Sequence, residues 1–173
     1  MDNAAPAILD SHQHFLDARR FRYPVFASRN AGFEALFGDY TALPRVYLPE
    51  DYSRDTEGLS VVKTMWVDFI SDDPGGEVRW ANELADVTGR PDGMIARVDF
   101  LDPELDRVLD AYASVGRVRC VRNIWAGIRR TRCSVLHPGA ISCAMTHGGA
   151  GSPLFVDVDW FARSRSLVHS CRT

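Results

Sequence analysis

Short apolar runs alternate with amphipathic stretches along the first two thirds of the chain. Four runs have the length and composition of buried strands, and they fall at residues 7–12, 61–69, 94–100 and 118–122. Between successive runs lie three stretches with helical signals, at residues 49–58, 77–88 and 102–112. This order of strands and helices predicts βα units and a parallel sheet with right-handed connections.

The helical signals differ in kind. Pro49 and Gly58 mark the start and the end of the first predicted helix. In the second predicted helix, most apolar residues fall on one face: Val78, Ala81, Leu84, Ala85 and Val87. In the third, the apolar residues repeat at i, i+3, i+4 and i+7: Leu105, Val108, Leu109 and Tyr112. Aromatic residues and prolines interrupt residues 15–48, which predicts a long loop over an active face, and residues 72–76 predict a short loop.

The pattern stops near Arg122. From Asn123 onward the chain contains no Glu and no Lys, and it is rich in Ser, Gly and Arg. That segment holds the cysteines Cys133, Cys143 and Cys171 and the histidines His137, His147 and His169. Apart from Leu154–Val156 it shows neither helical nor strand periodicity, which predicts two parts: an ordered region over 1–122 and an irregular tail over 123–173.

Composition and charge narrow the class of protein. The chain has 173 residues, of which 46% are hydrophobic and 25% charged, with a net charge of -3. An ordinary globular domain is therefore expected, and nucleic acid is not an expected partner. No apolar run approaches the roughly 18 residues that span a bilayer, and no secretory signal begins the chain, so the expected location is the cytoplasm. The four cysteines form no CxxC, and disulfides are not expected there.

Candidate chemistry is concentrated in the stretch Asp10-Ser11-His12-Gln13-His14. Side chains two residues apart on a strand point to one face, so His12 and His14 are expected to project together. Two imidazoles on one face can converge on a divalent ion such as zinc. Asp10 has the same parity and is expected to orient or support the pair. A chance HxH is the competing interpretation, and the motif's place at the end of an apolar strand argues against it.

Several stretches together resemble a known family. In order over residues 7–122 they are DSHQHF, FRYPVF, LPRVYLPEDYSRD, GLSVVKTMWVDF, WANELAD, MIARVDFLDPELDRVLD and VRCVR. They resemble the amidohydrolase superfamily, in the branch called amidohydrolase family 2, which includes lactonases of sugar-acid and aromatic catabolism. The resemblance implies a (β/α)₈ barrel and hydrolysis of a small-molecule lactone or related cyclic ester or amide. A complete barrel needs roughly 200 to 250 residues, so this chain is expected to form the first half.

The resemblance also implies site residues. His12 and His14 match the family's first two metal-site histidines, which implies a divalent metal, zinc or manganese, although some lactonases of this branch work without a tightly held metal. Where relatives carry His and then an acidic residue after the second strand, this chain has Trp66 and Asp68, so Asp68 is the catalytic candidate there. Arg119 and Arg122 fall on the fourth strand, where such barrels hold substrate carboxylates; a surface or structural role is the alternative for either.

The family draws a further His and a late-strand Asp from its second half, and neither can be placed on this chain. The tail histidines match no motif of the family. When the possible codons from Arg122 onward are read one base earlier, they allow QHLGWHPANPL, which resembles the family's continuation. We therefore hypothesise that a one-base insertion or deletion replaced the second half of the barrel. The DNA sequence around codons 120–125 tests this hypothesis.

Two classes of function remain. One is a lactonase-like hydrolase of which this chain is an inactive part. The other is a non-catalytic fragment or pseudogene product that associates with itself through open sheet edges.

Overall fold

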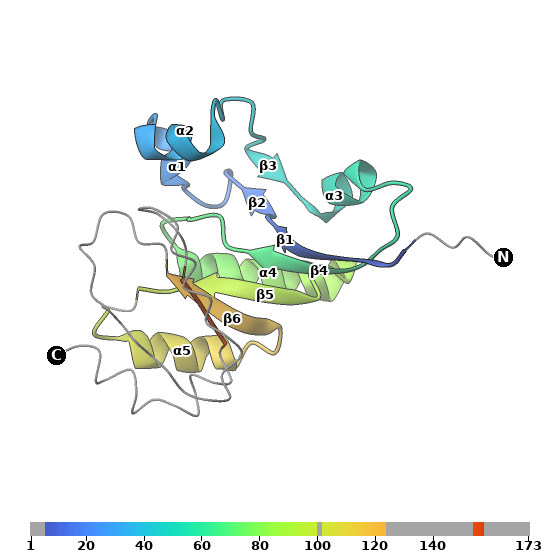
Figure 1. The fold of residues 1–173 in the computed structure, drawn as a ribbon. Coiled ribbons are helices and arrows are strands. Elements are labelled where there is room, and N and C mark those ends of the chain that lie inside the picture. The colour runs from blue at the N-terminus through green and yellow to red at the C-terminus, as the bar shows by residue number, and fades with distance from the viewer. Residues whose placement is uncertain (1–5, 100–101, 124–153, 158–173) are drawn as a thin grey trace. The chain divides into compact units, whose positions relative to one another are not determined.

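A computed structural model gives the fold, and it describes residues 6–99, 102–123 and 154–157. The chain divides into two compact units, Met1–Met94 and Ile95–Thr173. Strands and helices alternate in each unit, so the fold belongs to the α/β class, as the sequence predicted (Figure 1). The strands of the described part do not close into a barrel.

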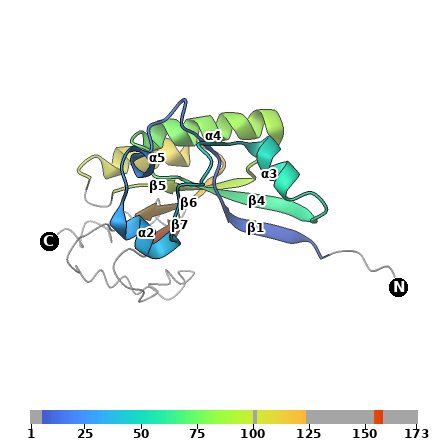
Figure 2. The same cartoon turned by 90° about the horizontal axis from the view of Figure 1, so that it is seen from above.

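The first unit is built on two parallel strands, β1 (Ile8–Gln13) and β4 (Val61–Val67). Figures 1 and 2 show them side by side, with helix α4 (Pro74–Thr88) running alongside β4. The register has an irregularity near the end of β1: Asp10 is opposite Thr64, whereas Gln13 is opposite Trp66. Three steps on β1 thus match two on β4, which is the pattern of a β-bulge.

The prediction of a long loop over residues 15–48 is wrong. That stretch contains β2 (Leu16–Asp17) paired antiparallel with β3 (Val46–Tyr47), and the helices α1 (Pro24–Ala27) and α2 (Ala31–Phe37). Helix α2 begins where the Asn30 side chain accepts a hydrogen bond from the Phe33 N–H. No repeating sequence pattern marks these short elements. Long-range pairing and aromatic packing hold them in place.

Helix α4 begins earlier than predicted, so residues 74–76, expected in a loop, are helical. The Asp73 side chain caps the first turn by accepting a hydrogen bond from the Gly76 N–H, and Pro74 occupies the first helical position. The helix ends at Gly89, whose φ of 78° is left-handed. Val78, Ala81 and Ala85 are buried as predicted, but Val87 is 85% exposed. Helix α3 (Pro49–Asp55) precedes β4 as expected.

The second unit contains a strand–helix–strand segment. Strand β5 (Gly93–Arg97) straddles the boundary between the units, and helix α5 (Leu105–Ala113) connects it to the neighbouring parallel strand β6 (Val118–Asn123). The Val98 N–H donates to the Arg122 carbonyl across these two strands. Leu105, Leu109 and Tyr112 are buried, which confirms the helical face predicted from their spacing.

One strand follows in the tail. β7 (Leu154–Asp157) covers the Leu154–Val156 stretch and pairs antiparallel with β6. The expectation of an irregular tail concerns mainly residues 124–153 and 158–173, which lie outside the described part. The handedness of the connections stays a prediction. Among the described helices, none has the length and apolar character required to cross a membrane.

Candidate functional site

The two histidines of the HxH motif come together at the end of β1. The Nε2 atoms of His12 and His14 lie 3.2 Å apart, and their rings meet edge to face with centroids 4.9 Å apart. His12 is exposed and His14 is partly buried, so the pair is open to solvent on one side. The convergence that the two-residue spacing predicted is therefore present.

The backbone of β4 fixes the His14 ring. The Nδ1 atom of His14 lies 2.7 Å from the Val67 carbonyl oxygen, and Phe69 packs against the same ring at 5.1 Å between centroids. A carbonyl only accepts hydrogen bonds, so Nδ1 carries the proton. The Nε2 atom of neutral His14 then presents a lone pair towards His12, which is the state a metal ligand requires.

The separation of the two nitrogens fits a shared metal ion. A tetrahedral zinc holds each imidazole nitrogen at about 2.0–2.1 Å, which places two such nitrogens about 3.3 Å from each other. The 3.2 Å between the Nε2 atoms lies close to that value. Within the residues that the structure describes, no group of three or more His, Cys, Asp or Glu side chains gathers at one point as a metal site.

Of the two parts expected of Asp10, to orient or to support the histidine pair, its hydrogen bonds fit the supporting one. Its Oδ1 atom accepts a hydrogen bond from the backbone N–H of His12, and its Oδ2 atom accepts one from the Tyr52 hydroxyl. The bulge between Asp10 and Gln13 shifts the alternation of side chains, so counting by twos from Asp10 to the histidines fails. Asp10 instead supports the backbone at His12.

Asp68 follows the last residue of β4 and is fully buried. Its Oδ2 atom accepts a hydrogen bond from the Ile70 N–H at 3.0 Å. Ile70 has a φ of 61°, a left-handed conformation that a β-branched residue rarely adopts. The carboxylate thus holds a strained turn directly after the Val67 carbonyl that contacts His14.

A second buried carboxyl, Glu77, was not identified from the sequence. It lies in the first turn of α4, is fully buried, and its Oε1 atom is 3.4 Å from the Phe69 backbone nitrogen. Burial, together with the charge of Asp68, raises the pKa of Glu77 to about 7. Burial also raises the pKa of the neighbouring Tyr23, and Glu77 contributes to that shift. A glutamate inside a helical pattern gives no sign of burial, because the groups that cover it come from distant segments.

The remaining candidates are placed separately. Trp66 is fully buried, and its indole N–H donates to the Phe15 carbonyl at 3.0 Å, so it serves the interior of the first unit. In the second unit, Arg122 is 5% exposed whereas Arg119 is exposed, and their spacing of three residues directs them to opposite faces of β6. His137, His147 and His169 lie outside the described residues.

Comparison with known proteins finds a relative of this chain. The chain is 33% identical over 118 residues to the uncharacterized protein y4mH of Sinorhizobium fredii, and the match covers 67% of this chain and 39% of that protein. The chain therefore spans well under half the length of the relative. No family model matches the chain, and no solved structure matches it.

Proposed function

We propose that His12 and His14 form part of the divalent-metal centre of an amidohydrolase-like hydrolase that acts on a lactone or related cyclic ester. The observation that carries the proposal is the 3.2 Å between their Nε2 atoms, together with the Val67 carbonyl that sets the His14 tautomer. The resemblance of residues 7–122 to amidohydrolase family 2 supports the reaction class. Zinc or manganese held there would supply a Lewis acid for the carbonyl and a more acidic water.

The residues of this chain have distinct parts in that proposal. His12 and His14 bind the ion, and the Val67 carbonyl keeps the His14 ring oriented. Asp68 is the acidic candidate of the second strand, and its hydrogen bond to the Ile70 N–H makes it a positioning residue for the turn. Arg119 and Arg122 are the candidates for a substrate carboxylate in the parent enzyme.

We further propose that the 173-residue chain itself turns over little or no substrate. Two histidines supply two ligands, whereas a catalytic zinc site usually has three protein ligands and one open position. Among the described residues, no third His, Cys, Asp or Glu side chain gathers with them as a metal site. Hydrolysis needs groups held to within about 0.5 Å by a rigid surrounding shell.

Metal binding is tested by zinc titration calorimetry on the full chain. We expect saturable uptake that weakens at least about tenfold in His12→Ala and in His14→Ala. His147→Ala is the matched control, because it removes a histidine that no motif assigns to the site, and it should leave uptake unchanged. Equal zinc affinity in the wild type and both site variants would refute the metal proposal.

Turnover is tested with a panel of sugar-acid and aromatic lactones in the presence of zinc or manganese. We expect rates no higher than those of the metal alone. Turnover well above that blank and lost in His12→Ala would keep the hydrolase assignment and overturn the inactivity of this chain.

A specific observation supports the non-catalytic alternative. In the described part of the chain β1 pairs with β4 on one side only, and Leu9 and Val62 on these strands are 59% and 56% exposed. An unpaired strand edge beside exposed apolar side chains favours association with another strand. The mass of the chain in solution distinguishes a self-associating fragment from a monomer.

A further inference from the structure

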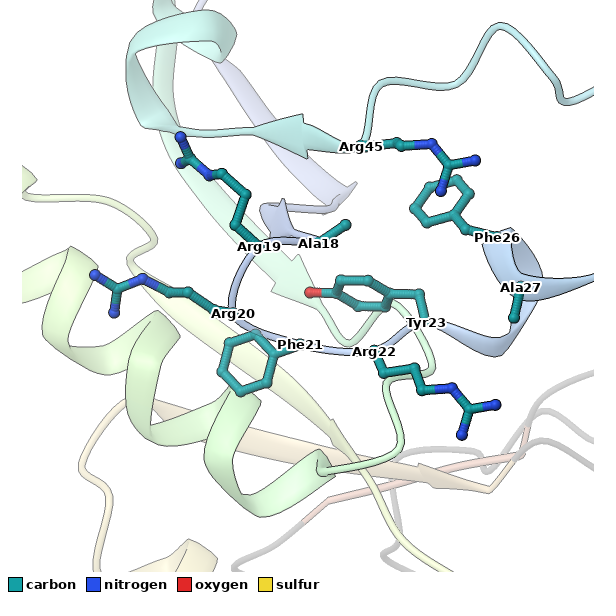
Figure 3. A pocket seen from close by; sticks show the side chains of 9 residues that line it. All are labelled: Ala18, Arg19, Arg20, Phe21, Arg22, Tyr23, Phe26, Ala27 and Arg45. Atoms are coloured by element: carbon teal, nitrogen blue, oxygen red, sulfur yellow. The ribbon is translucent and has the colours of Figure 1, made fainter.

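A cavity rich in arginine lies in the first unit, apart from the histidine pair. It has a volume of about 340 Å³ and is formed by the segment from Ala18 to Ala27 together with Arg45 (Figure 3). This volume lies at the lower end of the range of small-molecule sites. Neither His12 nor His14 lines it, so its occupant need not be the substrate of the hydrolase.

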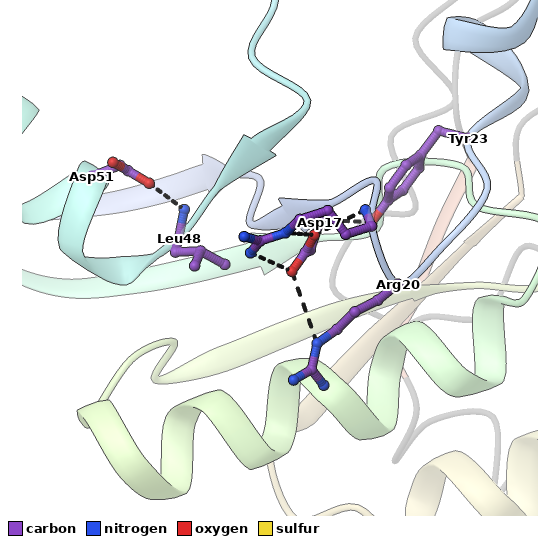
Figure 4. Close-up of polar contacts among 6 residues, drawn as sticks. Asp17, Arg20, Tyr23, Leu48 and Asp51 are labelled. Carbon is purple, nitrogen blue, oxygen red and sulfur yellow. Dashed lines mark hydrogen bonds and ion pairs between the residues drawn. The ribbon is translucent and has the colours of Figure 1, made fainter.

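Positive charge exceeds negative charge around this cavity. Four arginines line it: Arg19, Arg20, Arg22 and Arg45. Asp17 forms ion pairs with two of these arginines. Arg19 donates to both carboxylate oxygens of Asp17 at 2.8 Å. The Nε atom of Arg20 lies 3.8 Å from the Asp17 Oδ2 atom (Figure 4). Arg22 lies 3.6 Å from Asp72, and both side chains are substantially exposed. Two carboxylates therefore face four guanidinium groups.

Arg45 is the guanidinium without a carboxylate partner among the described residues. Its Cζ atom lies 5.0 Å from the centre of the Phe26 ring, and Figure 3 shows its head group against that ring. Contact with an aromatic ring positions the guanidinium without using its N–H groups, which can then bond a planar anion in bidentate fashion. The favourable cation–π contact does not neutralise the charge.

The cavity also has an apolar wall. Phe21, Tyr23 and Phe26 line it, and Tyr23 and Phe26 pack edge to face at 6.0 Å between centroids. Tyr23 is 2% exposed and supports the wall from behind, whereas Phe21 and Phe26 are partly exposed. An apolar wall beside an uncompensated guanidinium matches a ligand that has a flat apolar body and a carboxylate end.

We propose that this arginine pocket binds a small organic carboxylate with a planar apolar body, its carboxylate on Arg45 and its body against the partly exposed wall at Phe26. The site does not depend on the metal centre. Removal of zinc with a chelator, or the His12→Ala change, should therefore leave binding intact. This separates the proposal from the hydrolase assignment.

The test is titration calorimetry of the metal-free full chain with benzoate, benzyl alcohol and inorganic phosphate. We expect one benzoate per chain, at least about tenfold weaker binding of benzyl alcohol and phosphate, and at least about tenfold weaker binding of benzoate to Arg45→Gln. Arg107→Gln is the matched control, because Arg107 is an exposed arginine of α5 that lies 3.1 Å from Glu104 and does not line the cavity.

Three results would overturn the proposal. They are no saturable binding of benzoate to the wild type, equal binding to Arg45→Gln, and tighter binding of phosphate than of benzoate. If Arg45→Gln melts at a lower temperature than the wild type, Arg45→Lys replaces it. Lysine keeps the charge but not the planar fork, so benzoate binding should still weaken.

Discussion

The Nδ1 atom of His14 and the carbonyl oxygen of Val67 lie 2.7 Å apart, which ties the ring at the end of β1 to the last residue of β4. These residues are 53 positions apart in the chain. The contact selects one tautomer of a side chain that would otherwise be free to exchange between two. The availability of the Nε2 lone pair of His14 therefore depends on the pairing of the two strands.

This relationship predicts the nitrogen spectrum of the metal-free protein. In two-bond ¹H–¹⁵N correlation spectra at alkaline pH, His14 should show a protonated Nδ1 and an unprotonated Nε2. The backbone carbonyl cannot donate, so only that tautomer makes the contact. His169, which no motif places at the site, provides a comparison within the same spectrum. A protonated Nε2 on neutral His14 would contradict the assignment.

Glu77 predicts a pH dependence of stability. Its pKa rises from 4.5 to about 7 on folding, so between these values the folded state keeps a proton that the unfolded state has released. The free energy of unfolding should therefore fall as the pH rises from about 4.5 to 7, by up to about 3 kcal/mol, and then level off. Urea denaturation across this range measures it.

The Glu77→Gln variant isolates this contribution. Glutamine is neutral at every pH and of similar size, so the variant should lose most of the decline and gain stability relative to the wild type above pH 7. Glu83→Gln, an exposed change on the same helix, should retain the decline. A decline that persists unchanged in Glu77→Gln would assign it to other groups.

The turn after β4 predicts an unusual ranking of substitutions at Ile70. Its left-handed φ of 61° costs any residue with a Cβ about 1–2 kcal/mol, which glycine avoids. Ile70→Ala and Ile70→Gly both remove the side chain, so their difference reports on the backbone. We expect Ile70→Gly to be the more stable by about 1 kcal/mol, as measured by chemical denaturation. The opposite order would show that this turn is not left-handed in solution.

Leu9 predicts the effect of charge on association. Lysine on an exposed strand edge opposes pairing with a second strand, so Leu9→Lys should lower the mass in solution of any self-associated species. Val87→Lys, on the exposed side of α4, is the matched control and should leave the mass unchanged. Sedimentation equilibrium at several concentrations measures both. Equal dissociation in the two variants would indicate a general charge effect.

Elements with a strong period could be predicted from the sequence. The β4 strand at Val61–Val67 and the α5 helix at Leu105–Ala113 were expected within a few residues, because burial of one face imposes a repeat that the sequence displays. The two-residue strands β2 and β3 could not be predicted, since they are too short for any repeat. The start of α4 was missed although Asp73 and Pro74 carry a recognised start signal.

Only the local part of the candidate site could be predicted from the sequence. His12 and His14 form a local motif, so their convergence could be predicted from spacing. The contact of the Val67 carbonyl with His14 could not be predicted, because a backbone carbonyl has no sequence signature. The burial of Glu77 arises from tertiary contacts with Tyr23 and Phe69, which lie elsewhere in the chain.

The bulge between Asp10 and Gln13 has a consequence for how this motif tolerates change in length. A strand in strict alternation exposes its opposite face after the loss of one residue, whereas a bulge already contains a residue outside the alternation. Deletion of Ser11 would remove this extra residue and leave His12 and His14 two apart, while the opposite shift between Ile8 and Leu9, where one step on β1 matches two on β4, would remain. The spacing within the histidine motif therefore survives such a deletion, whereas the spacing between Asp10 and the pair does not.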